Sequence, residues 1–224
     1  MKKAYIIVVS LIACIILYLF EQVLTVNYIT KTIAKLILFI GIPYIYLKLV
    51  KKSSVKDGLN LRRFETSTLK LGLILGAVSF AVIIGVYFVL RGYIDFSGIV
   101  QELQFKSKVT PSNFIFVGLY ITFGNSFLEE FFFRGFIFLN LFNQGSKKLA
   151  YIYSSVLFSV YHIAIFKTWF NPLLIGLTLF GLISIGIIFD WLDNKTESFI
   201  NSWIVHALAD SAVIIIGMKM FNII

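Results

Sequence analysis

Long apolar runs separated by short polar stretches dominate the pattern of this chain. Each run is close to the about 20 residues that an α-helix needs to cross the hydrocarbon core of a bilayer. The pattern therefore predicts an all-α fold, a polytopic membrane helix bundle that forms one integral membrane domain over residues 1–224. Seven spans are expected, at about Ala4–Leu24, Ile29–Val50, Leu71–Leu90, Phe114–Phe138, Leu149–Phe166, Pro172–Trp191 and Phe199–Ile216.

The first apolar run resembles a signal peptide, because it follows Lys2 and Lys3 and contains a possible lipoprotein cleavage box ending at Cys14. Apolar residues continue past Cys14 to Phe20, whereas a cleaved signal gives way to polar mature sequence. We therefore expect a retained first span. The most polar stretch, from Lys51 to Lys70, is expected to be a loop with room for a short interfacial helix.

Composition and charge support the membrane assignment. Hydrophobic residues make up 59% of the chain and charged residues 14%, which excludes an ordinary soluble domain and a disordered chain. The net charge of +9 is explained by basic loops on the cytoplasmic face, so no nucleic-acid partner is expected. Twelve Lys and Arg residues fall on one face of the predicted topology and seven, among them Lys31 and Lys35, on the other. This bias predicts a cytoplasmic N-terminus and a C-terminus outside.

Ionisable residues inside apolar spans are costly and usually functional. The fourth span carries Glu129, Glu130 and Arg134. Glu130 and Arg134 are four residues apart and can form an ion pair on one helix face, which leaves Glu129 pointing elsewhere and free to act. The alternative is a clamp between helices with a purely structural role.

Both histidines of the chain also lie within predicted spans. His162 shares a helix face with Phe158, and His206 shares one with Asp210, since each pair is four residues apart. Considered alone, His162 could be an ordinary core histidine. His206 and Asp210 could simply form a hydrogen bond within their helix that hides both polar groups. Measured along each helix, however, the ionisable groups lie about 10–19 Å from the predicted cytoplasmic face, so three spans bring them to a similar level.

Other polar residues near these spans have supporting interpretations. Asn125 and Ser126 lie one turn before the acidic pair and are expected to help hold the site. Glu21, Asp190 and Asp193 lie near span ends and are interpreted as interfacial.

One carboxylate and two histidines in a partly wet cavity can activate water. Glu129 would act as the general base with help from His162, while His206 and Asp210 would stabilise the oxyanion of an amide hydrolysis. No cofactor is favoured, but Glu129, His162 and His206 are also the residues that would hold a metal such as zinc. A serine nucleophile elbow and a His-Glu-x-x-His motif are absent from the sequence.

Together, Glu129-Glu130-x-x-x-Arg134, Phe158-x-x-x-His162 and His206-x-x-x-Asp210, in this order on three late spans, resemble the CPBP family. This family comprises the CAAX prenyl endopeptidases and the bacteriocin-processing or bacteriocin-immunity (Abi) membrane proteins, and the resemblance covers about Phe114–Ile216. It implies an intramembrane endopeptidase in which Glu129 and His162 activate water, His206 and Asp210 form the oxyanion site, and Glu130, Arg134 and Phe158 support them. The family is often labelled metalloprotease, yet its architecture implies a glutamate-dependent enzyme. Prenyl proteases carry Asn where this chain has Asp210, so Asp210 would be protonated or would orient His206.

The small size and the Ile-, Lys-, Phe- and Asn-rich composition suggest a bacterial cell membrane protein. The expected partners are membrane lipid and a peptide or membrane-protein substrate, for example a bacteriocin or signalling-peptide precursor. Two alternatives remain, a non-catalytic bacteriocin self-immunity protein and a proton-coupled transporter.

Overall fold

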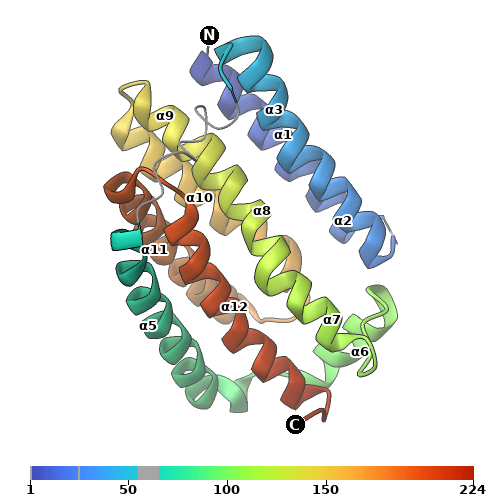
Figure 1. Cartoon of the computed structure of the whole chain (residues 1–224). Helices are drawn as coiled ribbons and strands as arrows, with labels where there is room; N and C mark the ends of the chain where they lie inside the picture. The colour runs from blue at the N-terminus through green and yellow to red at the C-terminus, as the bar shows by residue number, and fades with distance from the viewer. Residues whose placement is uncertain (1, 25, 55–65) are drawn as a thin grey trace.

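The computed structural model describes residues 2–24, 26–54 and 66–224 of the chain (Figure 1). Within these ranges the chain forms helices and turns without any β-strand, which confirms the predicted all-α fold class. Most of the predicted polar loop around residues 55–65, with its expected interfacial helix, lies outside the described residues. The helical elements, with π-helical or 3₁₀ segments labelled η, are α1 (Lys2–Gln22), α2 (Tyr28–Leu36), η1 (Ile37–Gly41), α3 (Ile42–Ile45), η2 (Tyr46–Lys51), α5 (Thr66–Leu90), η3 (Arg91–Tyr93), α6 (Phe96–Lys106), α7 (Phe114–Leu119), η4 (Tyr120–Asn125), α8 (Ser126–Glu130), η5 (Phe131–Phe138), α9 (Leu139–Asn143), α10 (Lys147–Phe166), α11 (Pro172–Thr196) and α12 (Ile200–Met220).

Capping side chains fix where three of these helices begin. Asn27, Asp95 and Asn171 precede α2, α6 and α11, and a side-chain oxygen of each accepts a hydrogen bond of 2.9–3.0 Å from the backbone N–H three residues later. Such caps satisfy one of the free N–H groups at a helix start. At Asp95, hydrogen bonds from the Ser97 hydroxyl and the Gly98 N–H also hold the pKa of the carboxyl below its ordinary value.

Six helices within the described ranges are long and apolar enough to cross a membrane: Lys3–Gln22, Tyr28–Lys51, Leu69–Tyr93, Lys147–Phe166, Pro172–Thr196 and Ile200–Met220. The first continues past Cys14 without a break, as expected for a retained span. The expected fourth span is not among the six, although it is helical from Phe114 to Asn143. The protein is thus a multi-pass membrane helix bundle, and the total of seven spans stays a prediction.

The helical path from Phe114 to Asn143, called the central helix below, runs along the length of the bundle (Figure 1). In this view α1 to α3 lie on one side of the central helix, while α12 and then α5 lie on the other. Helix α5 packs along α12, and α10 packs along α11. The two termini lie at opposite ends of the bundle.

Glycines allow α5 and α12 to approach closely. A Cβ atom added at Gly72 would come within 2.8 Å of Asn201 Oδ1, and one added at Gly76 would clash with the Leu208 side chain. Small residues spaced four apart are a common means of close helix packing in membranes.

Aromatic packing fixes the central helix against its neighbours. The Phe39 and Phe132 rings stack with centroids 4.1 Å apart, and Phe133 meets Phe39 edge to face at 5.7 Å. All three side chains are fully buried. The apolar run after the two glutamates therefore anchors the segment that carries them.

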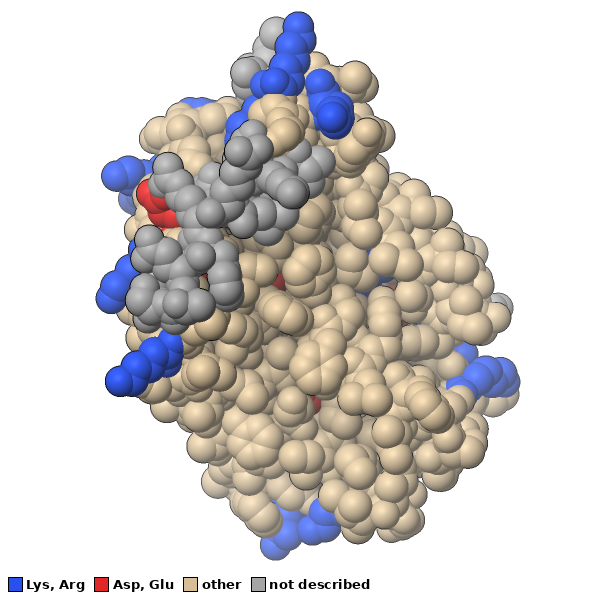
Figure 2. Space-filling model, viewed as in Figure 1, with Lys and Arg blue, Asp and Glu red and all other residues tan. Residues whose placement is uncertain are grey.

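The outer surface is consistent with a lipid environment. Figure 2 shows a face that is mostly uncharged, with Lys and Arg around its edge. Along α5 large apolar side chains are exposed, among them Leu73, Val78, Val82 and Val89. In lipid such side chains are in their preferred surroundings.

Candidate active site

Glu129 and Glu130 lie on α8, a short α-helical stretch between the π-helical segments η4 and η5. Both side chains are buried, with 1% and 0% of their surface exposed. One carboxylate oxygen of Glu129, Oε1, accepts hydrogen bonds from Lys35 Nζ at 3.1 Å and from Asn125 Nδ2 at 2.9 Å. The other oxygen, Oε2, has no hydrogen-bond partner, so it is the oxygen available for chemistry.

His162, on α10, faces this free oxygen. Its Nδ1 lies 2.7 Å from the backbone oxygen of Phe158, and its Nε2 lies 3.4 Å from Glu129 Oε2. A carbonyl oxygen only accepts hydrogen bonds, so Nδ1 carries a proton and Nε2 of the neutral ring is an acceptor. Two acceptors that face each other can share the protons of one water molecule.

His206, on α12, approaches from a third direction. Its Nδ1 lies 2.8 Å from Glu130 Oε1, while its Nε2 lies 3.9 Å from Glu129 Oε2 and 3.7 Å from Asp210 Oδ1. Glu130 therefore fixes the orientation of the imidazole ring. Nε2 points to the same small region as Glu129 Oε2 and His162 Nε2.

A buried charge network supports Glu130 from behind. Arg134 Nε lies 3.3 Å from Glu130 Oε2 and 3.5 Å from Asp190 Oδ1. The guanidinium group lies near the rings of Phe158 and Phe189, at 4.1 and 4.9 Å from their centroids. These contacts hold Arg134 within the bundle, fully buried.

The structure brings together the four residues predicted to be catalytic, Glu129, His162, His206 and Asp210, from three helices. The expected Glu130–Arg134 ion pair is confirmed, as is the support from Asn125. Glu129 points away from Arg134, as expected, although its Oε1 is held by Lys35 and Asn125. The Ser126 hydroxyl donates to the Thr122 carbonyl.

The interfacial interpretation of Asp190 and Asp193 is wrong. Both are fully buried, because serine hydroxyl groups and Arg134 compensate their polarity. Ser154 and Ser155 each donate to Asp190 at 3.0 Å, and a further serine, Ser202, donates to Asp193 at 2.8 Å.

Lys35 is the site residue that sequence reasoning missed. The topology placed it with the basic residues of one membrane face, but its ammonium group contacts Glu129 and Asn125 and its side chain is only 15% exposed. A signal was present in the sequence, since Lys35 lies six residues inside the predicted span that starts at Ile29. Ionisable residues within a span are functional candidates by default.

The donor set does not form a metal-binding group. Within the described residues, no cluster of three or more His, Cys, Asp and Glu side chains is arranged to hold a metal ion. Glu129 is already paired with an ammonium group, and His206 Nδ1 is already engaged by Glu130. We therefore derive no step through a metal.

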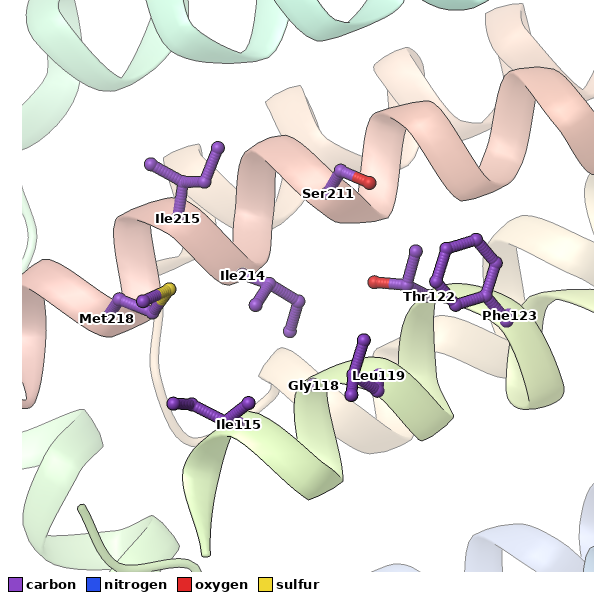
Figure 3. A pocket seen from close by; sticks show the side chains of 9 residues that line it. All are labelled: Ile115, Gly118, Leu119, Thr122, Phe123, Ser211, Ile214, Ile215 and Met218. Atoms are coloured by element: carbon purple, nitrogen blue, oxygen red, sulfur yellow. The ribbon is translucent and has the colours of Figure 1, made fainter. Parts of the chain in front are cut away.

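A groove of about 330 Å³ lies beside the site (Figure 3). It is formed by the first turns of the central helix and the second half of α12. Thr122 and Ser211 supply its only side-chain hydroxyl groups. Ser211 directly follows Asp210, and Thr122 precedes Asn125 by three residues, so the groove ends within about one helical turn of the site. The remaining lining residues are Ile115, Gly118, Leu119, Phe123, Ile214, Ile215 and Met218.

Residues 111–212 match a family model described as type II CAAX prenyl endopeptidase Rce1-like. This part of the chain is an Rce1-like domain. The match confirms the resemblance to the CPBP family, which includes such endopeptidases, and it contains all the predicted site residues. No curated protein and no solved structure matches the chain.

The match to residues 111–212 supports a CAAX-protease-like endopeptidase, and the candidate site lies within a membrane helix bundle. The matched residues contain the whole central helix, α10, α11 and most of α12. Lys35 lies outside them, on α2, so the Glu129 environment is completed by the N-terminal helices.

Proposed function

We propose that the protein cleaves a peptide bond of a membrane-associated peptide or protein with a water molecule activated by Glu129 and His162. The observation that carries this proposal is the convergence of Glu129 Oε2 and His162 Nε2, 3.4 Å apart. A water molecule that lies to one side of this pair, within reach of both atoms, would donate one hydrogen bond to each. Both contacts increase the nucleophilicity of its oxygen.

In this mechanism the water oxygen attacks the scissile carbonyl carbon, and the water proton passes to the Glu129–His162 pair. The carbonyl π electrons move to the oxygen, where a doubly protonated His206 donates from Nε2 while Glu130 accepts from Nδ1. Collapse of the tetrahedral intermediate breaks the C–N bond. As this bond breaks, the proton held by the pair passes to the nitrogen, which leaves as a neutral amine.

The groove between the central helix and α12 suits the apolar part of such a substrate, since its lining is almost entirely hydrocarbon. We propose a peptide or membrane-protein precursor, reached from the lipid, as the substrate class. The proposed location is a bacterial cell membrane, and the unequal distribution of Lys and Arg between the two faces supports a cytoplasmic N-terminus.

The test is hydrolysis by purified protein in lipid vesicles, with a quenched fluorescent farnesylated CAAX peptide and an apolar peptide library as probes. Glu129→Gln should reduce cleavage by about 10²–10⁴-fold, because it removes the proton acceptor. The matched control is Glu102→Gln, on α6, whose partners are Lys106 and the Thr168 hydroxyl. It should cleave normally.

Thermal unfolding and gel filtration of each variant show whether it remains folded. Normal cleavage by a folded Glu129→Gln variant contradicts the proposed mechanism. A variant without cleavage that still protects cells from a bacteriocin supports the non-catalytic immunity role instead.

A further inference from the structure

Lys35 is an ionisable residue of the N-terminal helices that contacts the catalytic carboxylate. It lies on α2, seven residues after the helix begins, and 94 residues before Glu129 in the chain. Its ammonium group is 3.1 Å from Glu129 Oε1 and 2.5 Å from Asn125 Oδ1. Asn125 Nδ2 donates to the same Glu129 oxygen at 2.9 Å. The three groups form a closed triangle around Oε1.

The contacts of Lys35 and Asn125 give the two oxygens of the Glu129 carboxylate different surroundings. Oε1 accepts two hydrogen bonds, one of them from a cation, while Oε2 accepts none and faces the two histidines. A carboxylate held at one oxygen cannot rotate about its Cγ–Cδ bond without breaking both hydrogen bonds. The direction of Oε2 toward His162 is thus set from the far side of the carboxylate.

The position of the ammonium group is itself fixed by neighbouring aromatic rings. It lies 5.3 Å from the Tyr161 ring centroid and 6.0 Å from that of Phe39, both within the range of a cation–π attraction. Phe39 in turn stacks on Phe132, next to the acidic pair. Lys35 is therefore held in place by its neighbours on both helices, whereas the side chain of an exposed surface lysine is flexible.

From this geometry we propose that Lys35 is a positioning residue of the hydrolytic reaction, which holds Glu129 Oε1 together with Asn125 so that Oε2 meets the attacking water. The inference rests on the proposed function, since it assigns a further residue to the same site. It also assigns the N-terminal helices a part in catalysis, although the Rce1-like match begins only at residue 111.

Three variants test the positioning role in the vesicle assay with the farnesylated peptide. Lys35→Met keeps the length of the side chain but has no charge, and it should lower kcat by about 10–100-fold with little change in KM, because misplacement of a catalytic group costs rate more than binding. Lys35→Arg, which can donate to both oxygen atoms, should recover most of the loss. Lys31→Met is the matched control, one turn away and paired with Glu21 at 2.6 Å.

A second measurement needs no substrate. Hydrophobic carbodiimides react with protonated carboxyl groups inside membranes, so labelling of Glu129 at one neutral pH, read by mass spectrometry, reports on its pairing with Lys35. We expect labelling to rise about tenfold or more in Lys35→Met, and to stay unchanged in Lys31→Met and close to unchanged in Lys35→Arg.

The two readouts separate the proposals. Unchanged labelling and unchanged kcat in Lys35→Met overturn the role of Lys35. A parallel rise in KM, or a loss that Lys35→Arg does not recover, also contradicts positioning. If labelling changes as expected but the unsubstituted protein cleaves none of the probes, the pairing stands and the proposed protease function fails.

Discussion

The acceptor next to each histidine decides what that histidine can do. His162 Nδ1 meets a backbone carbonyl, so a neutral ring presents an acceptor to Glu129, as a partner in proton removal requires. His206 Nδ1 meets the Glu130 carboxylate, which can accept from a neutral or a doubly protonated ring. The two rings therefore differ in the atom that Nδ1 meets, and this difference supports the different roles proposed for them.

Substitutions of Asp210 test the proposed stabilisation of the oxyanion at the level of a single residue. Its Oδ1 lies 3.7 Å from His206 Nε2, and Asn occupies the position in the prenyl proteases that the chain resembles. Asp210→Asn should retain cleavage, because its amide can donate to the oxyanion, whereas Asp210→Ala should lose about 10²-fold or more. Cleavage rates in vesicles measure both, with Asp95→Asn at the exposed cap of α6 as the control. Equal activity of Asp210→Ala and the unsubstituted protein would contradict an oxyanion role.

At the scale of elements, the central helix and its packing explain how the site is assembled. Segments η4 and η5 widen the helix on either side of the two glutamates, and π-helical turns often occur at functional sites. Helix α12, which carries His206, is held on its other side by α5 through the glycine contacts at Gly72 and Gly76. The position of His206 thus depends on a helix that contributes no site residue itself.

Gly76→Leu should force α5 away from α12, because its Cβ would clash with Leu208. Overpacking of this kind costs about 1–3 kcal/mol, so we expect a lower thermal unfolding midpoint in detergent and reduced cleavage. Gly85→Leu is the matched control on the same helix, since a Cβ there meets no atom within 4 Å. If both variants unfold at the same temperature as the unsubstituted protein, the close approach does not matter for stability.

At the scale of the whole molecule, a cluster of ionisable residues lies in the interior of an apolar bundle. The fully buried ionisable residues include Glu130, Arg134, Asp190 and Asp193, and the surface that encloses them is mostly uncharged. Burial of such groups is costly unless they are paired, and here they pair across the central helix, α10, α11 and α12. The bundle as a whole thus compensates the cost of the hydrolytic site.

Because Lys35 is already paired with Glu129 and Glu130 already holds His206 Nδ1, we expect cleavage to survive removal of divalent metals. The measurement is hydrolysis after treatment with EDTA and 1,10-phenanthroline, together with metal analysis of the purified protein. Loss of activity that added zinc restores would contradict this prediction and favour a metal held by Glu129, His162 and His206.

Much of the fold and part of the site could be predicted from sequence. Apolar run length determines which segments become spans, because only a fully hydrogen-bonded helix of about 20 residues crosses lipid. The spacing of four residues in Glu130–Arg134 and in His206–Asp210 determines shared faces within one helix. The residues of these two pairs could thus be predicted as site residues from their order and spacing along each span.

Only the tertiary structure decided which helices meet and which atoms face one another. From sequence, Lys35 is interpreted as a basic residue of one membrane face and Asp190 as an interfacial residue. In the structure, α2 packs against the central helix so that Lys35 contacts Glu129, and Arg134 lies beside Asp190. Periodicity describes the direction of a side chain around its own helix. It contains no information about the neighbouring helix, and in lipid that neighbour is chosen by close packing and by the pairing of buried polar groups.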